Sequence, residues 1–327
     1  MFNNLFARAR QRTRLRPCPL PSFYNNFLKH AFLLSLIIPF LASLLFISCA
    51  SASVSRESGQ LKTFPAVDNI QPQWENFYDG VGFYHGRVAS PRIEFYALKV
   101  DILAQNLRVV VKGGAVSDDG STLSVKVTSF VRDNNLIAGI NAAPFDVVSS
   151  QEGQPIKNSG LVVSDGKLIS PLNPRYDALV FFRDGSAQQK LNAVIVNQSS
   201  VYTTVNIENA AGGFFQILKD GQTTERTLAS EARHPRSAAG ISSDSRYLIL
   251  LVIDGRRTES AGATEKETAL LLRSLGAWDG INFDGGGSSA LALRYPDGKV
   301  KTANTPVHRF PGQERAVASC IGIQIIN

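Results

Sequence analysis

Nine short apolar or β-branched runs, each with the length of a strand, recur along the chain after residue 73. They cover residues 93–100, 107–111, 136–140, 178–182, 193–196, 214–218, 248–253, 290–293 and 321–326. Asp-Gly pairs, which are typical of tight turns, stand at 119–120, 165–166, 184–185, 220–221 and 297–298. The pattern predicts a strand-rich body with hairpins.

Helical periodicity is confined to two stretches, 124–134 and 264–275. The second carries leucines at helical spacing. Thr264 is its expected N-cap, and Glu267 three residues later completes a capping box. Gly276 follows as the expected C-terminal stop.

Length and composition place these elements in one domain. The 327 residues are 44% hydrophobic and 19% charged, as in an ordinary globular protein with a sizeable core. We therefore predict an α+β fold with mixed, strand-rich sheets and a few flanking helices. It forms a single large domain over residues 74–327.

The positive charge is concentrated at the N-terminus. The net charge is +7, and residues 1–48 hold six basic residues and no acidic one, so the rest of the chain carries only +1. A nearly neutral body offers no electrostatic footprint for a phosphate backbone. We expect no nucleic-acid partner.

An apolar run at 31–47 follows the basic head and ends at Ser48-Cys49. This order is typical of a secretory signal, and Cys49 stands where a lipoprotein signal places its lipidated cysteine. The alternatives are an uncleaved signal anchor, which would be short for a span, and a buried core helix. We expect residues 1–48 to be a signal or anchor and 49–73 a tether. The body would then be exported and held on a membrane, in the periplasm or at the cell surface.

The chain has three cysteines, Cys18, Cys49 and Cys320. With Cys18 in the basic head and Cys49 at the lipid site, no internal disulfide framework is expected. The apolar neighbours of Cys320 predict a buried small side chain rather than a nucleophile.

Four polar segments border predicted strands and are candidates for chemistry: 138–146, 234–241, 248–257 and 279–290. The end of a strand can present such side chains to a ligand. Structural interpretations remain open for the first three. Asn and Asp cap turns, a lone His before Pro is often a loop residue, and Asp254 beside two arginines could be only an ion pair.

The fourth segment is the most distinctive. Its short strand is followed by Asp284, three glycines and two serines. Consecutive glycines are costly in backbone entropy, but they let a ligand or another backbone approach closely. A phosphate-cradling loop of the Walker or GxGxxG kind is excluded, because the lysine and the spacing are absent. A flexible linker is excluded by the apolar strands on both sides.

Taken in order, these segments resemble the phosphodiester glycosidase family. The matching stretches are His-Pro-Arg-Ser at 234–237, Asp-Gly-Arg at 254–256, Asn282 through Ser289, and Glu-Arg-Ala-Val at 314–317. The chain departs from the family where Asn141-Ala142-Ala143-Pro144 replaces a glycine pair, which leaves the substrate open. The resemblance implies hydrolysis of a sugar-1-phosphodiester or a related glycosidic bond, in glycan or cell-envelope material.

The resemblance also implies roles for individual residues. Glycoside cleavage develops positive charge at the anomeric carbon, which carboxylates stabilise, and a phosphodiester needs cations. We hypothesise that Asp284 and Asp254 are the catalytic carboxylates, with His234 beside them. The expected substrate-binding residues are Asn141, Arg236, Asn282, Gly285, Gly286, Gly287, Ser288, Ser289 and Arg315.

Two alternatives remain open. Asp146, Asp254 and Asp284 carry oxygens that suit Ca²⁺ or Mg²⁺, although no EF-hand loop or His/Cys cluster supports such a metal. The protein could also be a non-catalytic surface lipoprotein that uses the same pocket to bind a carbohydrate or sugar phosphate.

Overall fold

The computed structural model describes residues 65–117, 119–183, 190–197, 206–229 and 232–326. They belong to the second of the two units into which the chain divides, Gln60–Asn327. The predicted signal at 1–48, the lipid site Cys49, the tether up to residue 64 and the turn at 184–185 lie outside the described residues. Among the helices that the structure describes, none is long and apolar enough to cross a membrane.

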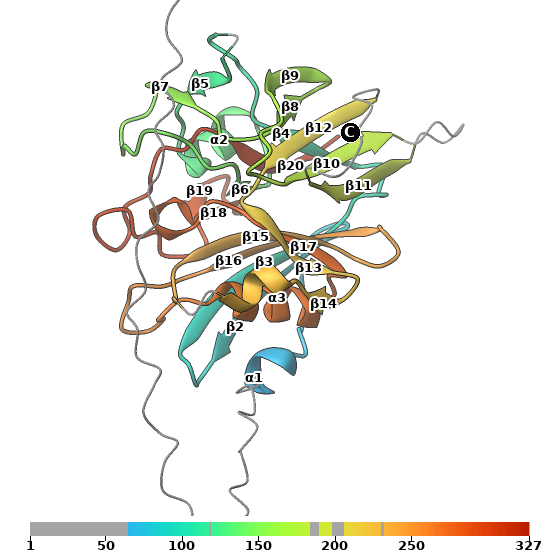
Figure 1. Cartoon of the computed structure of the whole chain (residues 1–327), viewed down its shortest axis with the longest axis vertical. Helices are drawn as coiled ribbons and strands as arrows, with labels where there is room; N and C mark the ends of the chain where they lie inside the picture. Colours follow the sequence, from blue (N-terminus) through green and yellow to red (C-terminus); the bar gives the residue numbers. More distant parts are fainter. Residues whose placement is uncertain (1–64, 118, 184–189, 198–205, 230–231, 327) are drawn as a thin grey trace, which may run out of the picture. The chain divides into compact units, whose positions relative to one another are not determined.

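The largest sheet has eight strands in the order β1–β2–β3–β16–β15–β17–β13–β14 (Figure 1). Every neighbouring pair in it is antiparallel. The strands are β1 (Glu75–Tyr78), β2 (Val81–Val88), β3 (Ile93–Asp101), β16 (Tyr247–Ile253), β15 (Arg236–Ile241), β17 (Asp279–Asn282), β13 (Phe215–Lys219) and β14 (Gln222–Thr223).

Three smaller antiparallel sheets complete the described fold. One is β11 (Leu191–Val196), β10 (Ala178–Arg183), β12 (Ile207–Gly212), β8 (Val162–Ser164) and β9 (Lys167–Ser170). Another is β19 (Val300–Thr302), β18 (Leu291–Arg294), β6 (Ala138–Asn141), β20 (Cys320–Ile325) and β4 (Leu107–Val111). The smallest pairs β5 (Ser121–Leu123) with β7 (Pro155–Lys157).

Alternate side chains of β16 enter two different hydrophobic cores. Leu248, Leu250 and Val252 pack into a core shared with the two five-stranded sheets. The side chains between them pack into a core shared with α3 (Glu265–Ser274). Figure 1 shows α3 on one side of the large sheet and the smaller sheets on the other. The unbroken apolar run at 248–253 therefore reflects burial on both faces.

Both predicted helices are present, but the predicted start is accurate for only one of them. In α3, the Thr264 hydroxyl accepts a hydrogen bond from the Glu267 amide over 3.1 Å, and the Glu267 carboxylate accepts one from the Thr264 amide over 2.9 Å. The capping box is thus confirmed. The other helix, α2 (Val127–Asp133), begins three residues later than expected, because the Ser124 hydroxyl binds the 151–154 loop instead of capping.

The nine predicted strands are all present to within about two residues, which confirms the α+β class. Most of the other strands are short and carry no apolar run, and in β2 two glycines interrupt the apolar pattern. In β2, Gly86 leaves the space that the Phe95 ring fills, since a Cβ there would lie 2.1 Å from the ring. The packed chain also begins before residue 74, because Val67 of α1 (Pro65–Asp68) is buried against α3.

Candidate active site

Three antiparallel strands bring the predicted motifs to one edge of the large sheet, the edge formed by the ends of its central strands. β15 begins where β16 ends, because Arg236 pairs with Ile253. The end of β17 lies beside the same region, since Ala238 pairs with Asn282. The segments around His234, Asp254 and Asp284 are therefore neighbours, although about 50 residues of chain separate the first from the last.

The glycine turn, residues 285–287, follows this edge and is closely packed. A Cβ at Gly285 would lie 2.7 Å from the Pro235 carbonyl oxygen. Gly286 has a φ of 61°, in the left-handed region that favours glycine. The glycines are needed here for close approach to the neighbouring backbone and for a sharp turn.

Two guanidinium groups flank the turn. A Cβ at Gly286 would lie 3.2 Å from Nη2 of Arg256, and a Cβ at Gly287 would lie 2.5 Å from Nη2 of Arg315. Arg256 follows β16 and Arg315 precedes β20, so the two side chains reach the turn from different elements. The bare backbone therefore makes room for two cations.

Asp284 is the carboxylate at the start of the turn. Its amide donates to the Ala142 carbonyl over 2.9 Å, which fixes the backbone. Burial raises the pKa of Asp284 to about 6, and a hydrogen bond with Ser288, the charge of Arg315 and the Gly285 amide oppose that rise. The side chain is therefore mostly ionised at neutral pH and becomes protonated in mild acid.

Arg315 links two further side chains to Asp284. Its Nη1 donates to the Ser288 hydroxyl oxygen over 3.0 Å, and its Nε donates to Nδ1 of His308 over 3.1 Å. The accepting Nδ1 places the imidazole proton on Nε2. That Nε2 is buried and has no hydrogen-bond partner in the described structure. Burial and the charge of Arg315 lower the pKa of His308, so the ring is neutral.

Arg256 and His234 are exposed at the same edge. Arg256 has a φ of 58°, which is uncommon for a non-glycine residue and often marks a functional position. Its guanidinium makes no ion pair or hydrogen bond within the described residues. Burial, Arg236 and Arg256, in that order, lower the pKa of His234. The edge thus carries a free cation and a largely neutral imidazole.

Asn141 has a structural position rather than the expected substrate-binding one. It is fully buried, and its Nδ2 donates to the Asp284 carbonyl over 2.6 Å. Its Oδ1 accepts from the Ser237 hydroxyl and from the Ala290 amide. The side-chain amide, which is buried, therefore ties β6 and β15 to both ends of the glycine turn.

Asn282 and Ser289 are buried beside the turn, as their side chains are about 1% exposed. Asn282 Oδ1 and Ser289 Oγ have no hydrogen-bond partner in the described structure. An unpaired buried polar atom is costly, so these two atoms are exceptions to the usual pairing of buried polar groups.

Arg236 also differs from expectation, because its guanidinium points away from the turn. Nε donates to the Ala263 carbonyl over 3.0 Å and Nη2 to the Ala232 carbonyl over 3.2 Å. Nη1 pairs with Glu265 over 3.3 Å at the start of α3. Three of its five N–H groups bind protein partners, so Arg236 anchors the start of α3.

Asp254 is not presented to a ligand either. Its side chain is completely buried, and Oδ2 pairs with Nη1 of Arg257 over 2.5 Å. Both oxygens also accept from the Thr305 amide, and Oδ1 accepts from Asn304. The ion pair that the sequence left open is therefore present, with Arg257 as the partner.

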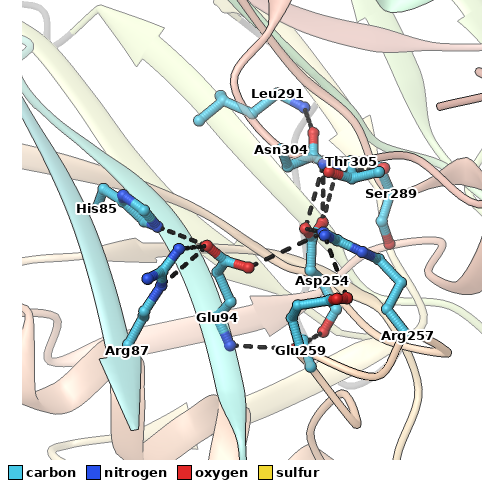
Figure 2. Close-up of polar contacts among 11 residues, drawn as sticks. His85, Arg87, Glu94, Asp254, Arg257, Glu259, Ser289, Leu291, Asn304 and Thr305 are labelled. Carbon is cyan, nitrogen blue, oxygen red and sulfur yellow. Dashed lines mark hydrogen bonds and ion pairs between the residues drawn. The ribbon is translucent and has the colours of Figure 1, made fainter. Parts of the chain in front are cut away.

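Figure 2 shows the network that Asp254 organises. Asn304 Nδ2 donates to the Ser289 carbonyl as well as to Asp254, so the carboxylate fixes the loop that leads to His308. On the other side, Arg257 Nη1 lies 3.9 Å from the buried Glu94 carboxylate, which binds His85 and Arg87 of β2. Asp254 thus holds the end of β16 and the glycine turn in place.

The predicted metal ligands do not form one cluster. Across the part of the chain that the structure describes, no group of three or more His, Cys, Asp and Glu side chains lies close enough to hold a metal ion. Asp146 is exposed and accepts a hydrogen bond from the Lys157 amide, while Asp254 is enclosed by its own partners. The three aspartates therefore lie in different environments, and of the three Asp284 alone lies at the glycine turn.

The sequence did not single out two residues that complete the site, Arg256 and His308. Arg256 lies inside the Asp-Gly-Arg motif, so its signal was available. His308 follows Val307 in a loop without any motif, and the hydrogen bond from its amide to the Gln313 carbonyl closes this loop and brings its ring to Arg315. Its role could not be inferred from local sequence.

Solved structures share the fold of this chain. One is the catalytic domain of zebrafish N-acetylglucosamine-1-phosphodiester alpha-N-acetylglucosaminidase, auto-inhibited by its pro-peptide. The TM-score is 0.57 and the sequence identity is 18%, over 78% of this chain and 88% of that one. The crystal structure of a hypothetical protein from Synechocystis gives a TM-score of 0.54 and 15% identity, over 79% of this chain and 64% of that one.

A curated relative is more similar in sequence. The SPbeta prophage-derived uncharacterized protein YomE of Bacillus subtilis (strain 168) is 26% identical over 182 residues, which are 53% of this chain. The aligned part spans only 27% of that relative's length. The model of the phosphodiester glycosidase family matches residues 134–324, more than half of the chain, so the protein belongs to the phosphodiester glycosidase family.

Proposed function

We propose that the protein hydrolyses a sugar-1-phosphodiester, with the reacting bond at the glycine turn. The observation that carries the proposal is the convergence of Arg256 and Arg315 on Gly286 and Gly287 beside Asp284. Two guanidiniums and one carboxylate leave one net positive charge. That charge complements a phosphodiester, which carries one negative charge.

Asp284 supports this reaction in its ionised form. When the bond between the anomeric carbon and the phosphate oxygen breaks, the electron pair leaves with the phosphate, and positive charge develops on the sugar. A carboxylate beside that carbon stabilises the charge or attacks the carbon. Water then supplies the new hydroxyl group and releases a proton.

One carboxylate is enough for such a leaving group. Ordinary glycosides need a second carboxyl group as a general acid, because an alkoxide leaves poorly. A phosphate monoester leaves without full protonation, and cations stabilise its charge. The enclosure of Asp254 by Arg257, Asn304 and Thr305 therefore favours a phosphodiester over a simple glycoside.

The identities of the sugar and of the leaving group are also proposals. The zebrafish relative is named for an N-acetylglucosamine-1-phosphodiester, which supports a sugar-phosphate substrate for this chain. In the segment that departs from the family, the Ala142 carbonyl accepts the Asp284 amide, so the departure lies next to the proposed catalytic group. We expect a substrate specificity that differs from that of relatives with the glycine pair.

The rival function is a glycan-binding protein without catalysis, and the same enclosure of Asp254 favours it, since binding needs no second carboxylate. The test is a panel of glycosyl phosphodiesters, such as UDP-sugars and methyl phosphodiesters of sugar 1-phosphates, with release of free sugar as the readout. Hydrolysis by the wild-type chain and its loss in Asp284→Asn, with binding retained, supports the enzyme. Binding without hydrolysis by the wild-type chain would establish the binder.

We further propose that the chain is exported and membrane-held through residues 1–48 and Cys49. The basic head, the apolar run and the cysteine support this proposal. Fractionation of cells that express the full chain, compared with Cys49→Ser, tests it. Release of the variant from the membrane fraction is expected for lipidation, whereas equal membrane retention favours an uncleaved anchor.

A further inference from the structure

A second polar hollow lies away from Asp284, at the other end of β17. It has a volume of about 430 Å³ and is bordered by β11, β13 and the start of β17. Asp279 opens β17 and Asp284 follows its end, so the two aspartates are about 16 Å apart along an extended chain. A ligand in this hollow would therefore not touch the reacting bond.

Trp278 forms an exposed aromatic surface in the hollow. The side chain is 45% exposed, which is unusual for tryptophan. One side of the ring rests on Gly221, where a Cβ would lie 2.8 Å from the six-membered ring. Within the described residues the ring makes no aromatic or cation–π contact, so part of its surface is open to solvent.

Hydrogen-bond acceptors surround this ring. Asp279 Oδ1 accepts from Gln216 Nε2 and from the Asp220 amide, whereas Oδ2 has no partner in the described structure. The exposed Asp220 carboxylate and the Asn192 side chain also line the hollow. Acceptors beside an aromatic face suit a molecule that has both hydroxyl donors and a C–H face, which is the chemistry of a pyranose ring.

Charge separates this hollow from the glycine turn. Asp220 and Asp279 face a single lysine, Lys219, so the lining is acidic. A phosphate would be repelled here, whereas Arg256 and Arg315 attract one at the other site. The two sites thus have opposite preferences for charge.

We propose that the hollow around Trp278 is a second sugar-binding site, which takes an uncharged pyranose unit of a glycan. The ring provides the platform, and Asp220, Asp279 and Gln216 accept hydrogen bonds from hydroxyl groups. This inference concerns a different site from the proposed function and does not depend on hydrolysis at Asp284.

The chain offers a direct reporter, because it has two tryptophans. In Trp74→Phe, which removes the tryptophan that packs against Tyr84, Trp278 is the sole indole fluorophore. The probes are the methyl glycosides of glucose, galactose, mannose and N-acetylglucosamine, with glucose 1-phosphate as the anionic control. At least one methyl glycoside is expected to change the fluorescence saturably, at concentrations up to about 50 mM.

Matched variants separate the two sites. Trp278→Leu in the wild-type chain should weaken binding of the same glycoside about tenfold by calorimetry, while Asp284→Asn should leave it unchanged. Asp279→Asn, which keeps the ring, should weaken it as well; circular dichroism checks that all variants are folded. If no glycoside changes the fluorescence, or if Asp284→Asn rather than Trp278→Leu abolishes binding, the second site is overturned. Absence of hydrolysis by the wild-type chain would contradict only the proposed function.

Discussion

Arg315 donates a hydrogen bond from Nη1 to the hydroxyl oxygen of Ser288 over 3.0 Å. The hydroxyl proton of Ser288 is thereby left to bind the carboxylate of Asp284, and this hydrogen bond lowers the pKa of the aspartate against the effect of burial. Ser288 and the nearby charge of Arg315 therefore both favour the ionised form of Asp284.

Ser288→Ala should shift the pH dependence of hydrolysis. In the wild-type chain the ionised Asp284 is needed, so the rate should fall about tenfold for each pH unit below about 6. Without the hydroxyl, the pKa of Asp284 rises further, and the acid limb should move to higher pH. A pH–rate profile measures this, and Ser242→Ala in an exposed turn serves as the control. A variant that is slower at every pH with an unmoved limb would contradict the role of Ser288.

Asp284→Asn should increase stability while it removes activity. The pKa of Asp284 is higher in the folded protein than in the unfolded chain, so between about pH 4 and 6 the folded protein binds the proton more tightly. Above that range the carboxylate is ionised in both states, and its buried charge opposes folding. At pH 7 the variant should gain up to about 3 kcal/mol in the free energy of unfolding. The gain should fade as the pH falls towards 4.

Chemical denaturation at pH 7 and pH 4 measures this effect. Asp297→Asn is the control, because the Lys299 amide lowers the pKa of that exposed carboxylate. The control should show no gain at pH 7. A loss of stability in Asp284→Asn would mean that the native site stabilises the charged form.

Arg256→Ala should weaken binding of glucose 1-phosphate about tenfold, because the guanidinium has no protein partner that would compensate for its loss. The free energy of unfolding should hardly change, because alanine and arginine bear the same backbone strain at a φ of 58°. Calorimetric titration measures the affinity. Arg309→Ala removes an exposed arginine of the neighbouring loop and should have little effect. Equal affinities in the wild-type chain and Arg256→Ala would exclude Arg256 from the anion site.

Asp254→Asn should destabilise the fold rather than act only on the reaction. Asparagine would lose the buried ion pair with Arg257, at a cost of roughly 3 kcal/mol, and this outweighs the relief from the burial that raises the pKa of Asp254. Asp101→Asn is the matched control, because its partner Arg246 is half exposed and the pair should contribute less than about 1 kcal/mol. Denaturant unfolding measures both. A fully stable Asp254→Asn that lost only turnover would restore the catalytic role expected from the sequence.

The sequence predicted strands and the main motif well, because both depend on local patterns. The apolar run at 248–253 predicted a strand with two buried faces, and the capping box at Thr264 predicted the start of α3. The assembly at the glycine turn also followed, since the motifs stand at the ends of antiparallel neighbours.

The direction of each polar side chain could not be predicted. Arg236 and Asp254 belong to motif stretches, yet both point into protein partners that lie elsewhere in the sequence, such as Ala263 and Asn304. His308, which no motif marks, lies against Gly287 and accepts a hydrogen bond from Arg315. Such contacts depend on tertiary packing, which a single sequence does not reveal.

The buried thiol of Cys320 can report on opening of the fold. The side chain is inaccessible in the sheet of β6, β20 and β4, and burial raises the pKa of its thiol, so a thiol reagent should react only when this sheet opens. In a fragment that begins at residue 60, it is the sole cysteine. The rate at which a thiol reagent labels the fragment would then report how often the sheet that backs the active site comes apart, with no engineered probe.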